Sequence, residues 1–208
     1  MSENSNTCPK LQSDINKQKQ LGRGKFGIVR TWGGDKVVKI EDCDKIEYKK
    51  KGFVPDLENR KKVIQPLVSA GLTPAIVGKS VCGNKCISFY KRVNGVQLAE
   101  AIKRSSKDEA MRLIKKGIST IESMHNLLSG SYSHGDLHTG NMMLTDKGRI
   151  KIIDFSIERG LSRAYDWQFF FESVQEDAGQ KVTKDELVDL IRENVPQNFQ
   201  GQVIRALK

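Results

Sequence analysis

The pattern of hydrophobic and polar positions changes character near the middle of the chain. Short apolar runs of β type fill the first part, at residues 27–32, 36–41, 75–81 and 86–93. Glycine-rich turns separate neighbouring runs, at Gly33-Gly34-Asp35 and at Gly83-Asn84, as is typical of hairpins. A helix is expected from Asp56 to about Ala70, with a kink or break at Pro66, because proline lacks the amide proton that a helix needs.

The second part of the chain has helical spacing. Residues 107–128 place one apolar stripe along a helix, which comprises Met111, Ile114, Ile118, Ile121 and Met124. Further helices are expected at 97–105, 163–176, 183–194 and 198–207, and short strands at 142–144 and 150–155. The pattern therefore predicts an α+β fold with an antiparallel sheet in a first lobe and helices in a second.

These elements define the expected organisation of the chain. Residues 1–16 are polar and without a period, so we expect a flexible leader. Residues 17–92 are expected to form the strand-rich lobe, and residues 93–208 the helical lobe of the same domain. A length of 208 residues is enough for such a domain to bury a core without additional cross-links.

Net charge and cysteine content limit the classes of partner and the cellular location that we expect. The formal net charge is +10, which favours anionic partners such as nucleotides, RNA or acidic proteins. The polar start carries no secretory signal, so the four cysteines are not expected to form disulfides, and a cytoplasmic or nuclear location is expected. No stretch approaches the roughly 20 apolar residues of a membrane span, so no membrane partner is expected.

The first candidate site is a glycine-rich segment before the first clear strand. Gly22, Gly24 and Gly27 form G-x-G-x-x-G, flanked by Leu21 and Val29. This string alone also occurs in dinucleotide folds, where it lies between a strand and a helix. Here the segment continues as a strand and turns into another strand, which favours a flap whose backbone amides contact phosphate oxygens.

A lysine within the next strand is the second candidate. Lys39 interrupts the apolar run of Val37, Val38 and Ile40, so its charge needs a partner or a phosphate unless the side chain faces water. Glu58, near the start of the following helix, is a candidate ion-pair partner for Lys39.

The third motif carries most of the functional interpretation. The sequence HGDLHTGN, residues 134–141, follows the long helix and precedes a strand, and it places Asn141 five residues after Asp136. Asp154 follows in I-I-D-F, thirteen residues after Asn141. An aspartate that accepts a hydroxyl proton, followed by an asparagine and a second aspartate that hold Mg²⁺, is the arrangement of a phosphotransferase loop.

In these motifs the sequence resembles the protein-kinase-like superfamily, over residues 21–166. Within that group it is more similar to the small atypical serine/threonine kinases, such as the kinase subunit of the KEOPS complex and the RIO kinases, which carry H-G-D-L and I-D-F. Minimal viral kinases are also close to it in size. The resemblance implies ATP and Mg²⁺ as cofactors and a protein substrate.

Residue roles follow from the same resemblance. Asp136 would be the catalytic base, with His134 bracing its loop, while Asn141 and Asp154 would hold Mg²⁺. The ATP-binding residues would be Lys39, paired with Glu58, together with Leu21, Gly22, Gly24, Gly27 and Val29. Residues Tyr90 to Val93 would form the hinge that receives adenine, and Asp166 would organise the catalytic loop.

Several departures from the family pattern leave alternatives open. His138 stands where protein kinases often have lysine, and H-G-D-L-H-x-G-N also occurs in small-molecule kinases. Ser156 replaces the last glycine of D-F-G, and Asp166 follows Asp154 by twelve residues, too few for a long activation segment. A small-molecule kinase and a kinase-fold ATPase or scaffold in an RNA-associated complex are therefore the alternatives to a serine/threonine protein kinase.

Overall fold

The chain forms two compact units. The computed structural model describes residues 7–23, 27–42, 57–128, 132–155, 158–159 and 162–208. One unit comprises residues 1–51 and 74–92, and the other comprises residues 52–73 and 93–208. Residues 52–73, which the sequence analysis assigned to the strand-rich lobe, therefore group with the helical unit.

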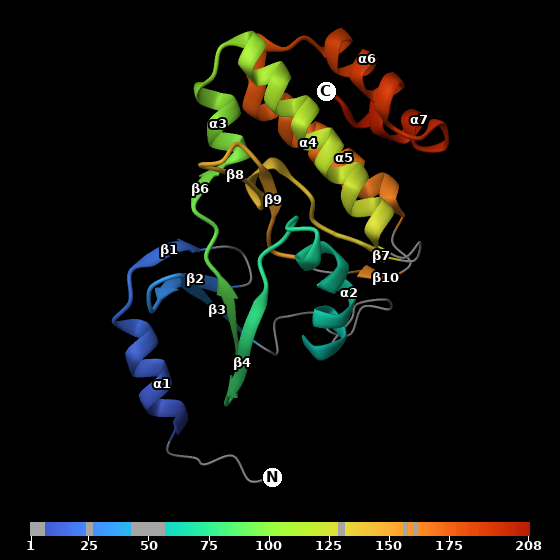
Figure 1. Cartoon of the computed structure of the whole chain (residues 1–208). Helices are drawn as coiled ribbons and strands as arrows, with labels where there is room; N and C mark the ends of the chain where they lie inside the picture. Colours follow the sequence, from blue (N-terminus) through green and yellow to red (C-terminus); the bar gives the residue numbers. More distant parts are fainter. Residues whose placement is uncertain (1–6, 24–26, 43–56, 129–131, 156–157, 160–161) are drawn as a thin grey trace. The chain divides into compact units, whose positions relative to one another are not determined.

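The first unit is built on an antiparallel sheet (Figure 1). Its spatial order is β1 (Gln20–Arg23), β2 (Gly27–Trp32), β3 (Lys36–Asp42), β5 (Lys85–Lys91) and β4 (Ile76–Cys82). Gly33 and Gly34 both have positive φ, 45° and 61°, in the turn between β2 and β3. Glycine makes that turn accessible, because other residues rarely adopt this conformation.

A helix at the start of the first unit corrects the expectation of a flexible leader. Helix α1 (Thr7–Asn16) covers one face of the sheet, where Leu11 and Ile15 pack in a cluster with Val38 and Ile87. Cys8, Leu11 and Ile15 are spaced i, i+3 and i+7, which gives a short apolar stripe. The polar residues between these positions obscured the stripe in the sequence.

The expectation that the cysteines are not cross-linked is also wrong. Cys8 of α1 and Cys82 of β4 form a disulfide across 74 residues of sequence, and Cys86 is disulfide-bonded as well. Cys82 lies in the same cluster as Ile15, so packing brings the two sulfur atoms together. This long-range pairing is not visible in the spacing of the cysteines.

The helical unit begins with α2 (Leu57–Ser69). The helix continues three residues past Pro66, so the expected break does not occur. Pro66 lies in the last turn, where its missing amide removes one backbone hydrogen bond to the preceding turn without ending the helix. The chain after α2 is fixed by the Leu72 carbonyl, which accepts a hydrogen bond of 2.8 Å from the Ile152 amide.

Helices and short strands make up the rest of this unit. The helices are α3 (Leu98–Arg104), α4 (Lys107–Leu127), α5 (Arg163–Ala178), α6 (Lys184–Asn194) and α7 (Gln197–Ala206). The strands are β6 (Gly95–Gln97), β8 (Met142–Thr145) and β9 (Ile150–Ile152) in one sheet, and β7 (Tyr132–Ser133) with β10 (Glu158–Arg159) in another. Strands β7 and β10 were not predicted from the sequence, because each has only two residues.

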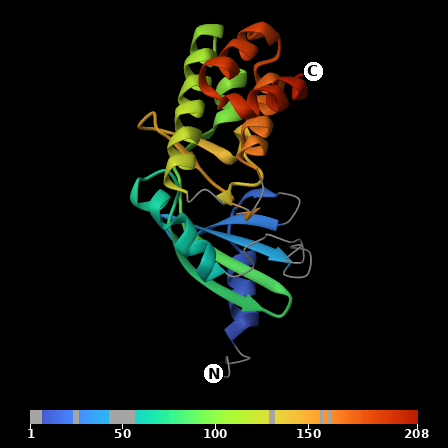
Figure 2. The ribbon, with the colours of Figure 1, turned by 90° about the vertical axis from the view of Figure 1, so that its right-hand side faces the viewer.

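The core of the helical unit lies between α4 and α5, which run side by side (Figure 1 and Figure 2). Ile114, Ile118 and Ile121 of α4 are fully or almost fully buried, as are Trp167 and Phe170 of α5. This confirms that the stripe predicted for residues 107–128 is core. The α+β fold with an antiparallel sheet is likewise confirmed. No helix in the described ranges is long and apolar enough to cross a membrane.

Candidate active site

The HGDLHTGN loop is held first by its own histidine. His134 is fully buried, and its Nδ1 accepts a hydrogen bond of 3.2 Å from the Asp136 amide. Its Nε2 lies 3.0 Å from the Ile153 carbonyl, so the proton resides on Nε2 and is donated there. Burial lowers the pKa of His134 and keeps the ring neutral, as this pair of bonds requires. His134 thus joins the loop to the residue that precedes Asp154.

A buried carboxylate from α5 holds the same loop by its backbone. Asp166 is fully buried, and its Oδ2 and Oδ1 accept hydrogen bonds from the amides of His134 and Gly135, at 2.9 and 3.1 Å. Nε2 of His125 on α4 lies 3.0 Å from the same Oδ2. Asp166 was predictable from the sequence, whereas His125 was not, because its position at the end of the apolar stripe carries no chemical signal.

Asp136, the candidate catalytic base, has an exposed carboxylate within this loop. Its side chain is 55% exposed, while its carbonyl accepts a hydrogen bond of 2.9 Å from Nδ2 of Asn141. His138 Nε2 lies 3.9 Å from Asp136 Oδ2, and the His138 Nδ1 accepts from the Gly140 amide at 3.1 Å. The backbone is therefore fixed on both sides of a carboxylate that remains exposed to solvent.

Asn141 and Asp154 are adjacent through the backbone. The Ile153 amide donates a 2.8 Å hydrogen bond to the Asn141 carbonyl, which pairs the two segments. Because Nδ2 of Asn141 is engaged by Asp136, its Oδ1 is the atom left to face a ligand. An amide oxygen and a carboxylate are the hard donors that Mg²⁺ prefers, so this pair fits that ion.

Asp154 has an unusual backbone conformation. Its φ of 60° makes it the only non-glycine residue with positive φ in the ranges that the structure describes. Such conformations cost of order 1–3 kcal/mol and cluster at functional sites, where surrounding contacts impose them. The exposed side chain of Asp154, in the segment after β9, is consistent with a ligand-binding role.

The lysine of the first unit is engaged in an ion pair. Lys39 Nζ lies 2.8 Å from Glu41 Oε1, and the two side chains are 16% and 10% exposed. Both residues project from the face of β3 opposite Val38, which packs toward α1. Glu41 was not among the residues predicted from the sequence, although it follows Lys39 at the i+2 spacing of one strand face. Glu58 is in α2, but its side chain lies outside the described residues.

The glycine-rich segment forms the β1–β2 hairpin. Gly22 pairs with Val29 in the register of the two strands, and Leu21 is exposed on β1. A Cβ at Gly27 would lie 2.4 Å from the Ile40 carbonyl oxygen, so this glycine permits close approach of β2 to β3. Gly24 lies outside the described residues.

The predicted hinge residues lie at the end of β5. Tyr90 pairs with Val37 of β3 and with Ile76 of β4, while the Arg92 amide donates to the Asp35 carbonyl at 2.6 Å. Val93 is the first residue of the segment that joins the helical unit. The lysine, the glycines and Tyr90 therefore belong to one unit, and Asp136, Asn141 and Asp154 to the other.

Comparison with known proteins agrees with these features. Residues 15–169 match the model of the family described as protein tyrosine and serine/threonine kinases. The chain is also similar to cyclin-dependent kinase 11.1 of Caenorhabditis elegans, with 31% identity over 160 residues. That alignment covers 70% of this chain and 21% of the relative, so the chain spans about a fifth of that curated protein.

The family match includes the glycine-rich hairpin, Lys39, the HGDLHTGN loop and Asp154 in a single alignment. It covers about three quarters of the chain and ends within α5, just beyond Asp166. The chain belongs to the protein tyrosine and serine/threonine kinase family.

Proposed function

We propose that this chain is an ATP-dependent serine/threonine protein kinase. The observation that carries the proposal is the HGDLHTGN loop, in which His134, Asn141 and Asp166 fix the backbone around an exposed Asp136 carboxylate. A carboxylate held in this way can receive a proton from a substrate hydroxyl without reorganising the loop.

In the proposed reaction, a serine or threonine oxygen forms a bond to the γ-phosphorus of ATP. The bond between that phosphorus and the β,γ-bridging oxygen breaks, ADP leaves, and the hydroxyl proton passes to Asp136. Little covalent chemistry is asked of the protein, so catalysis consists mainly of positioning and electrostatic stabilisation. The preference for serine and threonine over tyrosine is drawn from the H-G-D-L and I-D-F signatures.

The remaining site residues are assigned to binding. Asn141 and Asp154 would hold Mg²⁺, which neutralises charge on the ATP phosphates when bound. Lys39 would contact the α- and β-phosphates, and Glu58 would hold Lys39 in place. The hairpin with Leu21, Gly22, Gly24, Gly27 and Val29 would cover the phosphates, and the backbone from Tyr90 to Val93 would receive adenine.

Transfer of labelled γ-phosphate to a protein lysate tests the proposal. The Asp136→Asn variant should lose transfer and retain ATP binding, because the amide cannot take up the proton. Asp146→Asn, the same change in the exposed turn between β8 and β9, is the matched control and should transfer like the parent. Equal transfer by the parent and the Asp136 variant would contradict the assigned role.

Small-molecule phosphorylation is the second candidate activity. It is favoured by His138, which lies beside Asp136 within a loop pattern shared with small-molecule kinases. A panel of metabolite hydroxyl compounds, assayed in parallel with the lysate, separates the two activities. Transfer to a metabolite and to no protein would establish this alternative.

Partners and location follow from charge and family. The net charge of +10 supports an acidic protein or an RNA as a partner, as expected of a scaffold or ATPase in a larger complex. RNA affinity that falls steeply with salt would support that role. The disulfide between Cys8 and Cys82 removes the argument for a cytoplasmic or nuclear location that was based on reduced cysteines. We propose that location from membership of the kinase family alone.

A further inference from the structure

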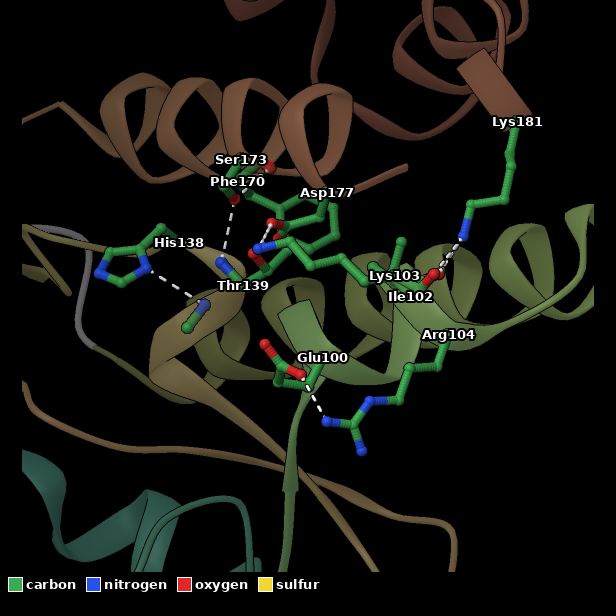
Figure 3. A network of polar contacts seen from close by, with 11 residues as sticks. Glu100, Ile102, Lys103, Arg104, His138, Thr139, Phe170, Ser173, Asp177 and Lys181 are labelled. Carbon is green, nitrogen blue, oxygen red and sulfur yellow. Dashed lines mark hydrogen bonds and ion pairs between the residues drawn. The ribbon is translucent and has the colours of Figure 1, made fainter. Parts of the chain in front are cut away.

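The second half of the catalytic loop is held by α5 through a separate set of contacts (Figure 3). The Thr139 amide donates a 3.0 Å hydrogen bond to Ser173 Oγ, and the Thr139 hydroxyl donates to Asp177 Oδ2. Ser173 in turn donates to the Phe170 carbonyl at 2.8 Å, which fixes the direction of its oxygen. Both the backbone and the side chain of Thr139 are therefore bound by one face of α5.

The other oxygen of Asp177 is also engaged. Lys103 Nζ of α3 lies 3.1 Å from Asp177 Oδ1, and the carboxylate raises the pKa of Lys103. Lys181 donates to the carbonyls of Ile102, Lys103 and Ser105, which ties the end of α3 to the turn after α5. Asp177 thus links α3, α5 and the loop, with both oxygens occupied and only 9% of the residue exposed.

Stability alone is a weak reason to bury this carboxylate. Removing a charge from water is costly, and well-packed apolar residues often stabilise such a position equally well. The position of the cluster supplies another reason, because Thr139 lies two residues before Asn141 and three after Asp136. The intervening Gly140 is held by Gln97, whose Nε2 donates to the Gly140 carbonyl at 2.9 Å.

We propose that Asp177, acting through Thr139, is a positioning residue that fixes the backbone between Asp136 and Asn141. Asp166 holds the first half of the loop, and Asp177 with Ser173 holds the second half. Neither Asp177 nor Ser173 touches the reacting groups. This inference rests on the proposed kinase activity, since its kinetic consequence requires phosphoryl transfer.

Kinetics of three variants test the proposal. Thr139→Val keeps the shape of the side chain but removes the hydroxyl, and Asp177→Ala removes its acceptor. Each should lower kcat about 10- to 100-fold with a smaller change in KM for ATP, as expected when a hydrogen bond to a charged group that positions the loop is lost. The kcat of the double variant should be little lower than that of the more impaired single variant, because both changes remove the same hydrogen bond between Thr139 and Asp177.

Two further variants serve as matched comparisons. Thr139→Ser keeps the hydroxyl and should restore most of the kcat lost in Thr139→Val. Asp189→Asn, on the exposed face of α6, should keep the parental kcat. A role of Thr139 through side-chain shape alone would not separate serine from valine in this way, because valine has the shape of threonine and serine has its hydroxyl.

Amide hydrogen exchange provides a readout that does not depend on activity. Without nucleotide, the amides of residues 138–141 should exchange faster in Thr139→Val and Asp177→Ala than in the parent, while those of α6 stay unchanged. The inference is overturned if Thr139→Val keeps both the parental kcat and the parental rate of amide exchange at residues 138–141. This test needs only the Thr139 variant, so it holds even if Asp177→Ala does not fold. If the parent transfers no phosphate, the proposed function fails, and exchange still decides whether Asp177 positions the loop.

Discussion

Replacing Asp166 with alanine removes the acceptor on which the first half of the catalytic loop depends. The carboxylate is fully buried and accepts hydrogen bonds from the amides of His134 and Gly135 and from His125. A buried donor left without an acceptor costs about 1–3 kcal/mol, so the two amides alone account for about 2–6 kcal/mol. Breaking comparable buried charged sets costs about 3–5 kcal/mol, which we expect for Asp166→Ala.

Such a loss is a large part of the 5–15 kcal/mol that typically stabilises a domain. Urea denaturation followed by tryptophan fluorescence measures it, and Asp189→Asn, on the surface of α6, serves as a control that should change the free energy of unfolding little. Asp166→Asn should fall between parent and alanine, because an amide offers one acceptor oxygen and directs its NH₂ toward a donor. A loss below about 1 kcal/mol for Asp166→Ala would refute the reasoning, because the unpaired amides would then have found other partners.

Three further predictions concern regions outside the loop. Cys8→Ser should lower the free energy of unfolding by about 4 kcal/mol, because the bond to Cys82 closes a loop of 74 residues. An unchanged melting temperature would argue against a native bond. Gly27→Ala should weaken ATP binding, measured by calorimetry. The new Cβ would lie 2.4 Å from the Ile40 carbonyl oxygen and would push β2 away from β3. An ATP affinity equal to that of the parent would show that the strands adapt. The Lys107 ammonium, followed by the Thr183 amide, lowers the pKa of Glu186 from 4.5 to about 2, so its stabilisation is present above pH 4.5 and is lost as the pH falls toward 2. Glu186→Gln should therefore flatten the decline of melting temperature across that interval, and an unchanged slope would contradict the assignment.

The sequence predicted those parts of the fold in which local pattern and final structure agree. The helix at residues 107–128 has an apolar stripe over several turns, and the HGDLHTGN loop has a fixed spacing that the chemistry requires. Both signals lie within short windows, so neither depends on knowing the rest of the structure.

The missed features depend on contacts between distant residues. Helix α1 has only three apolar positions, and its burial became evident only with the cluster around Val38. The bond between Cys8 and Cys82 spans 74 residues, and the contact between Thr139 and Asp177 spans 38. No spacing rule links such residues, because their proximity results from the packing of whole elements.

A crystal structure of the chain with Mg²⁺ and a non-hydrolysable ATP analogue tests the central claim most directly. The account predicts that Lys39 contacts the α- and β-phosphates, that Asn141 and Asp154 ligate the metal ion, and that the Asp136 carboxylate faces the γ-phosphate. Lys39 directed into bulk solvent, far from the carboxylates of Asp136 and Asp154, would contradict the account.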